Sequence, residues 1–120
     1  MGEELNVIIR VFRARALPGM GATHERMMRE LSMPLVEAQR GLIAFYVGRP
    51  VGSNADEYTM VSLWEDIEAL RAFAGGDWEQ AVIPEPERPN LQEVHVHHYE
   101  VFGTGGAATP AQERTQTEQQ

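Results

Sequence analysis

The sequence predicts one α+β domain with the element order β-α-β-β-α-β, the ferredoxin-like plan with an antiparallel four-stranded sheet. The clearest observation is the run YTMVSLWEDIEALRAF at residues 58–73, where strand-like alternation changes to helical spacing with almost no loop. A second is the β-branched segment NVIIRVFRA at residues 6–14, and a third is the set of glycine and proline turns between segments. The 120 residues, 42% of them hydrophobic, suffice for one small core.

The first half of the order is a strand, a helix and a second strand. Pro34 should interrupt the helix because proline has no amide to donate, and Ser32 is placed to cap a short continuation that ends at Gly41. The expected bounds are a strand at 6–14, a helix at 21–31, a helical piece at 35–39 and a strand at 42–49.

The second half repeats the plan after the turn segment PVGSNAD at residues 50–56, which predicts a hairpin. Asp66 is placed to cap the second helix, and Gly75-Gly76 should end it. The expected bounds are a strand at 58–64, a helix at 67–74, a short turn at 77–80, a stiff irregular connection at 83–90 and a strand at 91–102. Residues 1–102 would form the domain, and the Gly-, Thr- and Gln-rich residues 103–120 a disordered tail.

Composition excludes several kinds of function. The net charge of -8 argues against a nucleic-acid or anionic-membrane partner. Cysteine is absent, which excludes thiol nucleophiles, disulfides and thiolate metal sites, and the absence of lysine excludes a side-chain Schiff base. The N-terminus has no signal-peptide pattern and no apolar stretch could span a bilayer, so we expect a cytoplasmic protein.

The strands are apolar on both faces. Val7, Ile9 and Val11 would face one way and Ile8 and Phe12 the other. Two helices cover only one face of such a sheet, so the other needs a partner. We therefore expect a homodimer formed sheet against sheet.

The segments GLIAFYVGRP and VSLWEDIEALRAF resemble the antibiotic biosynthesis monooxygenase family, over residues 5–102. The resemblance implies a dimeric α+β barrel with a substrate cavity between sheet and helices. It also implies oxygenation of anthrone- or quinol-like aromatics without metal or prosthetic group, or, in one branch, haem degradation. The stretch GGDWEQAVIPEPE resembles a subgroup for which the resemblance supplies a fold but no substrate.

The chain departs from the family pattern at positions that carry its known reactions. Quinol-oxidising relatives usually have a histidine where this chain has Phe73 and Ala74. The haem-degrading branch places a tryptophan near Phe73 and a haem-ligating histidine near Ile83, and this chain has neither. The haem-degrading hypothesis is weakened accordingly.

Two histidines are candidate catalytic residues. His98 alternates with Val94 and Val96 on the last strand, which predicts a place under the helices where it could act as a general base. His24 lies on the inward stripe of the first helix and could meet His98 across the cavity. The alternative for His98 is a hydrogen-bonded structural histidine, and the alternative for His24 is a polar group near the cavity mouth, bonded to backbone or water. His95 and His97 share the opposite strand face, where a dimer-interface role is favoured over a metal site.

Five further residues are candidates for substrate binding. Arg10 lies on a central strand, where it would either pair with Glu100 or bind a substrate carboxylate. The other four would form an apolar pocket: Trp78, Tyr46, Met27 and Phe73.

The family resemblance, taken with these candidate residues, implies a monooxygenase that needs no cofactor and no metal, acting on an aromatic, quinol or polyketide-like molecule. His98, helped by His24, would deprotonate the substrate so that its anion reduces oxygen directly. The alternatives are a non-catalytic small-molecule-binding dimer of the same fold and a haem-binding protein.

Overall fold

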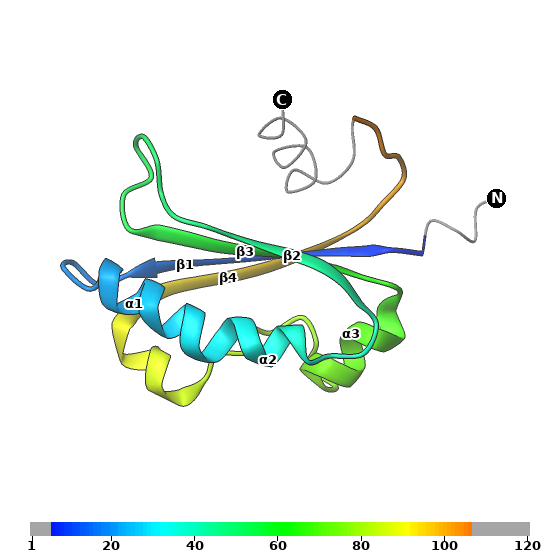
Figure 1. The fold of residues 1–120 in the computed structure, drawn as a ribbon, viewed down its shortest axis with the longest axis horizontal. Helices are drawn as coiled ribbons and strands as arrows, with labels where there is room; N and C mark the ends of the chain where they lie inside the picture. The colour runs from blue at the N-terminus through cyan, green and yellow to red at the C-terminus, as the bar shows by residue number, and fades with distance from the viewer. Residues whose placement is uncertain (1–5, 107–120) are drawn as a thin grey trace, which may run out of the picture.

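The computed structural model of the chain describes residues 6–106, and Figure 1 shows its two layers, a sheet and a set of helices on one face of it. The predicted α+β class and the β-α-β-β-α-β order are confirmed. The elements are β1 (Ile8–Ala16), α1 (Gly21–Met27), η2 (Met28–Ser32), α2 (Met33–Glu37), β2 (Leu42–Gly48), β3 (Glu57–Trp64), α3 (Ile67–Ala74), η3 (Glu85–Asn90) and β4 (Leu91–Glu100).

The four strands form one antiparallel sheet in the order β2-β3-β1-β4. The central strand β1 pairs with β3 on one side and β4 on the other, so that Arg10 lies opposite both Ser62 and His98. This register places the side chains of these three residues on the same face, the one that the helices cover.

The core lies between the sheet and the helices. Trp64 and Leu70 are fully buried there, and Met28, Val36 and Met60 pack around them. The alternation in β3 is complete, since every second residue from Tyr58 to Trp64 is buried. The period-2 pattern of the sequence therefore identifies the core face of this strand correctly.

The first helical stretch changes its hydrogen-bonding pattern twice. A π-helical turn, η2, separates α1 from α2. Pro34 lies in the first turn of α2, directly after the π-helical turn. The prediction that Ser32 caps a helix is wrong: its side chain makes no cap bond, and its hydroxyl instead donates to Oε2 of Glu87 at 2.5 Å.

The junction between β3 and α3 follows the sequence closely. The Asp66 side chain accepts a hydrogen bond from the amide of Ala69 at 2.8 Å, which caps the helix as predicted. Gly41 approaches this helix with φ +84°, and a Cβ there would lie 2.4 Å from Cβ of Ala69. Only glycine fits such a contact in the left-handed region.

The connection after α3 is more regular than the sequence indicates. Residues 85–90, expected to be irregular, form the 3-10 helix η3. Pro86 fits its first turn because the amide there needs no acceptor. Residues 103–106, the described part of the predicted tail, contain no helix or strand, and the rest of the tail lies outside the described residues.

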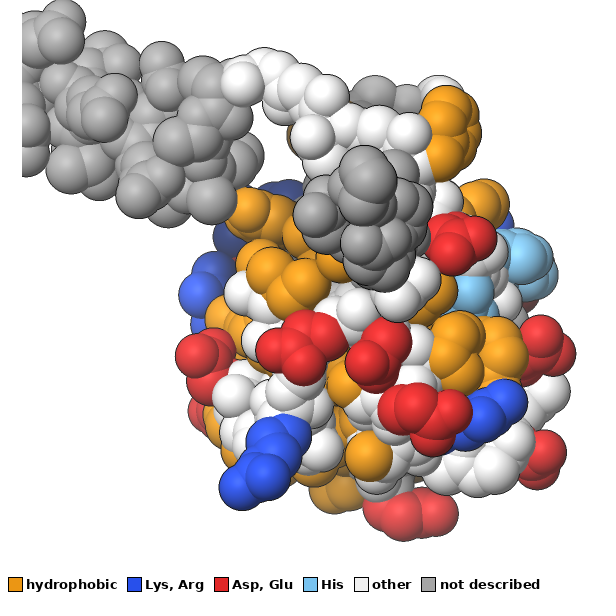
Figure 2. All heavy atoms as spheres, turned by 90° about the vertical axis from the view of Figure 1, so that its right-hand side faces the viewer, with side chains coloured by type: hydrophobic (Ala, Val, Ile, Leu, Met, Phe, Trp, Pro, Cys, Tyr) orange, Lys and Arg blue, Asp and Glu red, His pale blue; other side chains and the backbone are white. Residues whose placement is uncertain are grey.

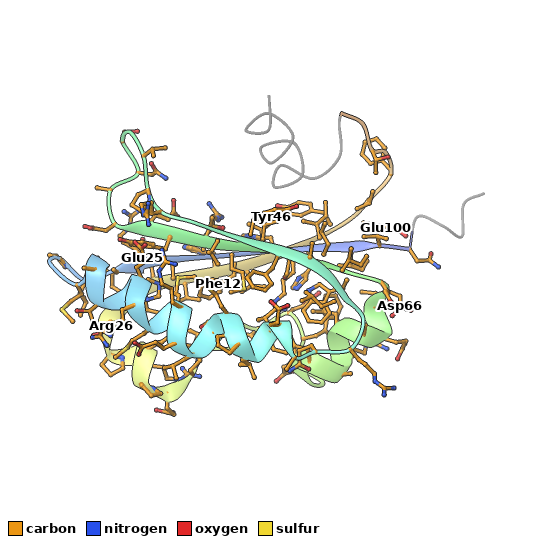
Figure 3. All side chains as sticks on the ribbon, in the orientation of Figure 1. Phe12, Glu25, Arg26, Tyr46, Asp66 and Glu100 are labelled. Atoms are coloured by element: carbon orange, nitrogen blue, oxygen red, sulfur yellow. The ribbon has the colours of Figure 1, made fainter. Side chains whose placement is uncertain are left out.

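The other sheet face carries no helix, and we call it the open face (Figure 1). Figure 3 shows Tyr46 on this side and Phe12 on the helical side. In the end-on view of Figure 2, hydrophobic and histidine side chains lie on the upper side, where the open face is. Large hydrophobic side chains are exposed here, including Ile43 (51%) and Tyr99 (54%). None of the described helices is long and apolar enough to cross a membrane.

Candidate functional site

The most unusual group between sheet and helices is the guanidinium of Arg10, a residue that is 4% exposed. Its Nη1 donates to the carbonyl of Trp78 at 2.7 Å, and its Nη2 donates to the carbonyl of Gln80 at 3.0 Å. The predicted pair with Glu100 is wrong, because Glu100 lies opposite Ile8 in the register. None of the ion pairs between residues 6 and 106 includes Arg10.

The charge of this guanidinium is only weakly compensated. Burial lowers the pKa of Arg10 to about 10, and the group remains a cation at neutral pH. The ring of Phe73 lies 5.8 Å from its Cζ, which provides a cation–π contact. A buried cation without a paired carboxylate is costly, and groups with such perturbed pKa values concentrate at functional sites.

His98 contacts this cation directly. Its Nε2 lies 2.9 Å from Nη1 of Arg10 and must accept, because a guanidinium only donates. The ring also meets Trp78 edge to face at 4.8 Å. Burial, the charge of Arg10 and that of His97 lower the pKa of His98 to about 4, so the ring is neutral at pH 7 and a weak base.

A small cavity, which we call the inner cavity, opens beside Arg10. Its volume of about 30 Å³ holds one or two waters. Ser62 in its wall accepts a hydrogen bond from Nε1 of Trp64 at 2.9 Å and keeps its own proton to donate. The wall consists of Arg10, Phe12, Met28, Ser32, Leu35, Val36, Met60, Ser62, Phe73, Val82 and Glu87.

Glu87 and His24 form a second buried polar pair. Glu87 is 1% exposed and His24 is fully buried, with its Nδ1 3.9 Å from Oε1 of Glu87. His24 also packs edge to face on Tyr58, 5.1 Å away. Burial lowers the pKa of His24, and it raises the pKa of Glu87 against the opposing hydrogen bond from Ser32.

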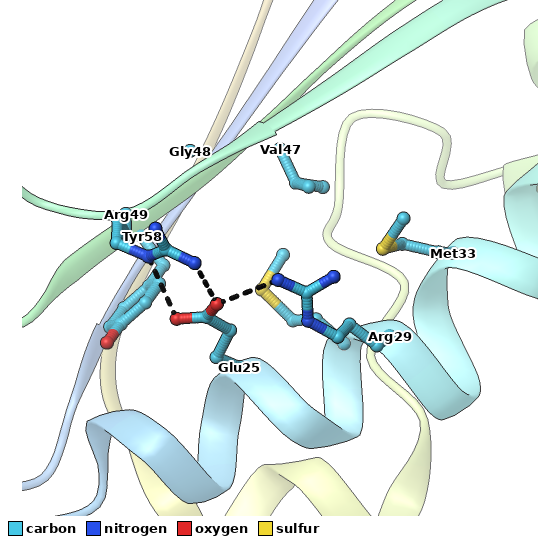
Figure 4. A pocket seen from close by; sticks show the side chains of 8 residues that line it. Glu25, Arg29, Met33, Val47, Gly48, Arg49 and Tyr58 are labelled. Carbon is cyan, nitrogen blue, oxygen red and sulfur yellow. Dashed lines mark hydrogen bonds and ion pairs between the residues drawn. The ribbon is translucent and has the colours of Figure 1, made fainter.

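A larger pocket, the outer pocket, lies where α1 and η2 face the edge strand β2 (Figure 4). Its volume is about 170 Å³. Glu25 lies in its wall between Arg29 and Arg49, and hydrogen bonds from Arg49 and then Arg29 lower the pKa of Glu25 to about 2. The lining residues are Glu25, Met28, Arg29, Met33, Val47, Gly48, Arg49 and Tyr58. Met28 belongs to both walls.

The structure brings together four of the seven residues singled out from the sequence: Arg10, His98, Trp78 and Phe73. It does not bring His24 to His98. His24 packs on Tyr58, which pairs with Ala14, four residues along β1 from the partner of His98 and so roughly 13 Å away.

The other two predicted site residues, Tyr46 and Met27, lie away from Arg10 and His98. Tyr46 is on the open face and 42% exposed, and the sulfur of Met27 accepts from Nδ2 of Asn90 at 3.3 Å. Three polar residues of the inner cavity were missed: Ser32, Ser62 and Glu87. The alternation of β3 could have identified Ser62, whereas no periodicity marks Glu87 among its prolines.

Comparison with known proteins identifies the class. The family model for antibiotic biosynthesis monooxygenases matches residues 7–82, and the chain belongs to this family. A search of curated proteins found no match.

Solved structures share the fold at low sequence identity. SnoaB from Streptomyces nogalater, described as a cofactor-independent oxygenase and solved as a point mutant, has a TM-score of 0.65 and 14% identity, covering 82% of this chain and 96% of its own. The haem degrader MhuD from Mycobacterium tuberculosis was solved with two haems in its active site. Its TM-score is 0.62 and its sequence identity 22%, and the match covers 82% of this chain and 99% of MhuD. Protein SO0527 from Shewanella oneidensis has a TM-score of 0.66 and 18% sequence identity, and the match covers 81% of this chain and 92% of SO0527. At these identities the likeness establishes the fold alone.

The residues present do not fit haem. Of the two histidines on the helical side, His98 is engaged by Arg10, and His24 is fully buried between Tyr58 and Glu87. The inner cavity, at about 30 Å³, is far smaller than a macrocycle. Within residues 6–106, no group of three or more histidine or acidic side chains could hold a metal ion.

Proposed function

We propose that the protein is a cofactor-independent oxygenase of a small aromatic substrate, such as a phenol, quinol or anthrone-like molecule of polyketide type. The observation that carries this proposal is the buried Arg10 guanidinium, held by two carbonyls and a neutral imidazole at an otherwise largely apolar cavity. A cation so placed stabilises a substrate anion, the species that can give electrons to oxygen without a cofactor. Family membership agrees with this chemistry but does not specify it.

The reaction balances without any added redox group. For an anthrone-like substrate, the CH2 group opposite the ring carbonyl loses a proton, and the resulting anion is held by Arg10. The anion gives one electron to O2, and the substrate radical and superoxide combine to a peroxide at the same carbon. Loss of water then leaves a carbonyl, so that one oxygen atom enters the product and the other leaves as water. Exclusion of water from the cavity protects the anion from being protonated.

His98 would serve this reaction by positioning Arg10. Its Nε2 is engaged by the guanidinium, and its low pKa makes it a poor proton acceptor at neutral pH. A His98→Gln variant keeps an acceptor for Arg10 and should retain most activity, whereas His98→Ala should not. Equal losses in both variants would return His98 to the role of base that we predicted from the sequence.

An aromatic substrate needs more room than the inner cavity offers, since a cavity of about 150 Å³ is needed for benzene. The outer pocket, at about 170 Å³, has that size, and Met28 lines both spaces. Methionine side chains change rotamer easily. We therefore propose that the substrate enters through the outer pocket and displaces the Met28 side chain to reach Arg10.

The test is oxygen uptake with a panel of quinols and anthrones that includes dithranol. Charge stabilisation at about 4 Å and an effective dielectric constant near 20 is about 4 kcal/mol, so Arg10→Gln should lower the rate by about a hundredfold to a thousandfold. Arg71→Gln is the matched control, because Arg71 is exposed on α3 and pairs with the exposed Glu68. Uptake no faster than the uncatalysed reaction across the panel would favour the alternative, a binding protein without catalysis.

We also propose that a second copy of the chain covers the open face. Besides Ile43 and Tyr99, Phe102 just after β4 is 93% exposed, and a shallow hollow of about 920 Å³ lies among these residues. Covering this apolar surface is favourable by the hydrophobic effect. Light scattering should give twice 13.4 kDa, and a particle of 13.4 kDa would contradict the dimer.

A further inference from the structure

The proposed reaction needs a proton acceptor, and the inner cavity contains one carboxylate, Glu87. This residue is 1% exposed and lines the same wall as Arg10. The only ion-pair contact of Glu87 among the described residues is with His24, at 3.9 Å. A buried carboxylate without an arginine is as unusual as the buried arginine without a carboxylate, and the two share one cavity.

The surroundings hold this carboxylate in place and leave one of its oxygens available. The hydroxyl of Ser32 donates to Oε2 at 2.5 Å, which fixes the rotamer of Glu87. Oε1 lies 3.9 Å from Nδ1 of His24, which is beyond hydrogen-bond distance. Oε1 therefore retains its capacity to accept a proton.

His24 supports the same interpretation. Both of its ring nitrogens are buried, and neither has a hydrogen-bond partner within residues 6–106. A buried polar group without a partner is costly, and a catalytic role is one of the explanations for keeping it. If Oε1 takes up a proton, a small movement would let it donate to Nδ1 of His24, so the ring can stabilise the acid form of Glu87.

We propose that Glu87 is the catalytic base of the inner cavity, with Ser32 and His24 as its positioning residues. This inference rests on the proposed function. Glu87 would take the proton from the substrate carbon at Oε1, return it to the peroxide, and take up and release the second proton as water leaves. Each proton is thus returned, and Glu87 ends the cycle as a carboxylate.

Charge conservation makes the transfer favourable in a dry site. Before the proton transfer, the wall of the inner cavity carries the Arg10 cation and the Glu87 anion. After it, Glu87 is neutral and the negative charge lies on the substrate beside Arg10. The net charge of the cavity does not change, so the step requires no new buried charge. Burial raises the pKa of Glu87, which makes it a stronger base than an exposed carboxylate. The charged or titratable groups around it are Arg10 from β1 and His24 from α1.

The experiment separates proton transfer from oxygenation. Dithranol is mixed with the protein without oxygen, and the visible absorbance of its anion is followed with pH. Glu87→Gln should bind dithranol within about threefold of the wild type but form its anion about a hundredfold more slowly. Glu85→Gln is the matched control: it neutralises an exposed glutamate of the same helix η3 and should behave as the wild type. Anion formation by Glu87→Gln within threefold of the wild-type rate would overturn the inference.

A second variant tests the role of Glu87 even if Glu87→Gln folds poorly. Ser32→Ala keeps the carboxylate but removes the hydrogen bond that lowers its pKa, so the pH of half-maximal anion formation should rise. An unchanged pH profile would also overturn the inference. Admitting air afterwards tests the oxygenation separately: an anion that forms but consumes no oxygen would refute the proposed function and leave Glu87 as the base.

Discussion

Acid should destabilise the protein through His98, and the size of the effect follows from the burial of its imidazole ring and the charges beside it. Burial and the neighbouring charges of Arg10 and His97 lower the pKa of His98 to about 4 in the folded chain. Unfolding restores it to about 6.5. Between these values the unfolded chain binds more protons than the folded chain, so the free energy of unfolding falls as the pH falls. The contribution is fully present above pH of about 6.5 and fully lost below pH of about 4.

The expected loss is large for a small domain. A pKa difference of about 2.5 corresponds to about 3 kcal/mol as an upper bound, and solvent screening of the partly exposed ring reduces the expected loss to about 1–2 kcal/mol, against a typical total stability of 5–15 kcal/mol. Glu25 also loses a stabilising interaction in acid, but its pKa of about 2 places most of that loss at lower pH. His24 acts in the same direction as His98, and a comparison of the wild type with a His98 variant cancels its contribution.

The assay is urea unfolding followed by the fluorescence of Trp64 and Trp78, from pH 4 to 8 and at one protein concentration. His98→Gln keeps an acceptor for Arg10 and removes the titrating group, so the wild type should lose about 1–2 kcal/mol more than this variant across the range. His95→Gln, which removes a histidine from the exposed side of the same strand, is the matched control. If the wild type and His98→Gln differ by the same amount at every pH, the account of the Arg10–His98 contact is refuted.

Three further predictions concern stability, each measured by urea unfolding. Gly41→Ala should lower the free energy of unfolding by at least about 2 kcal/mol, because it adds a clash with Ala69 to the backbone strain of a positive φ. Gly52→Ala is the control: Gly52 has φ +72° but open space around it, so the loss should be only about 1 kcal/mol. Equal losses in the two variants would refute the clash. Asp66→Ala should cost about 1 kcal/mol through loss of the α3 cap, and no loss would refute the cap. Leu70→Ala should cost about 2–5 kcal/mol, because the side chain is fully buried, and a loss below about 1 kcal/mol would refute its place in the core.

Much of the fold follows from local patterns. The change of period after Trp64, the cap at Asp66 and the turn at Gly41 each depend on neighbouring residues, and all three occur as predicted. The π-helical turn and the 3-10 helix at residues 85–90 do not follow in this way. Their hydrogen bonds depend on how the helical layer packs, and Ser32 bonds to Glu87 across that layer in place of capping a helix.

The site could be predicted only in part. Alternation in the strands shows which residues share a face, and this suffices to place Arg10 with His98 once the register of β1 and β4 is known. It does not show which face the helices cover, so Tyr46 could be assigned to the cavity although it lies on the open face. Glu87 could not be found because burial of an isolated carboxylate depends on tertiary contacts alone.

The central claim is that this cavity uses Arg10 to hold a substrate anion that reacts directly with oxygen. The most direct measurement is mass spectrometry of the product after turnover of dithranol under 18O2, with the wild type and Arg10→Gln compared at equal protein concentration. The account predicts one 18O atom in the wild-type product, the other in water, and at least about a hundredfold less labelled product from Arg10→Gln. A product without 18O, or equal labelling by both proteins, would contradict it.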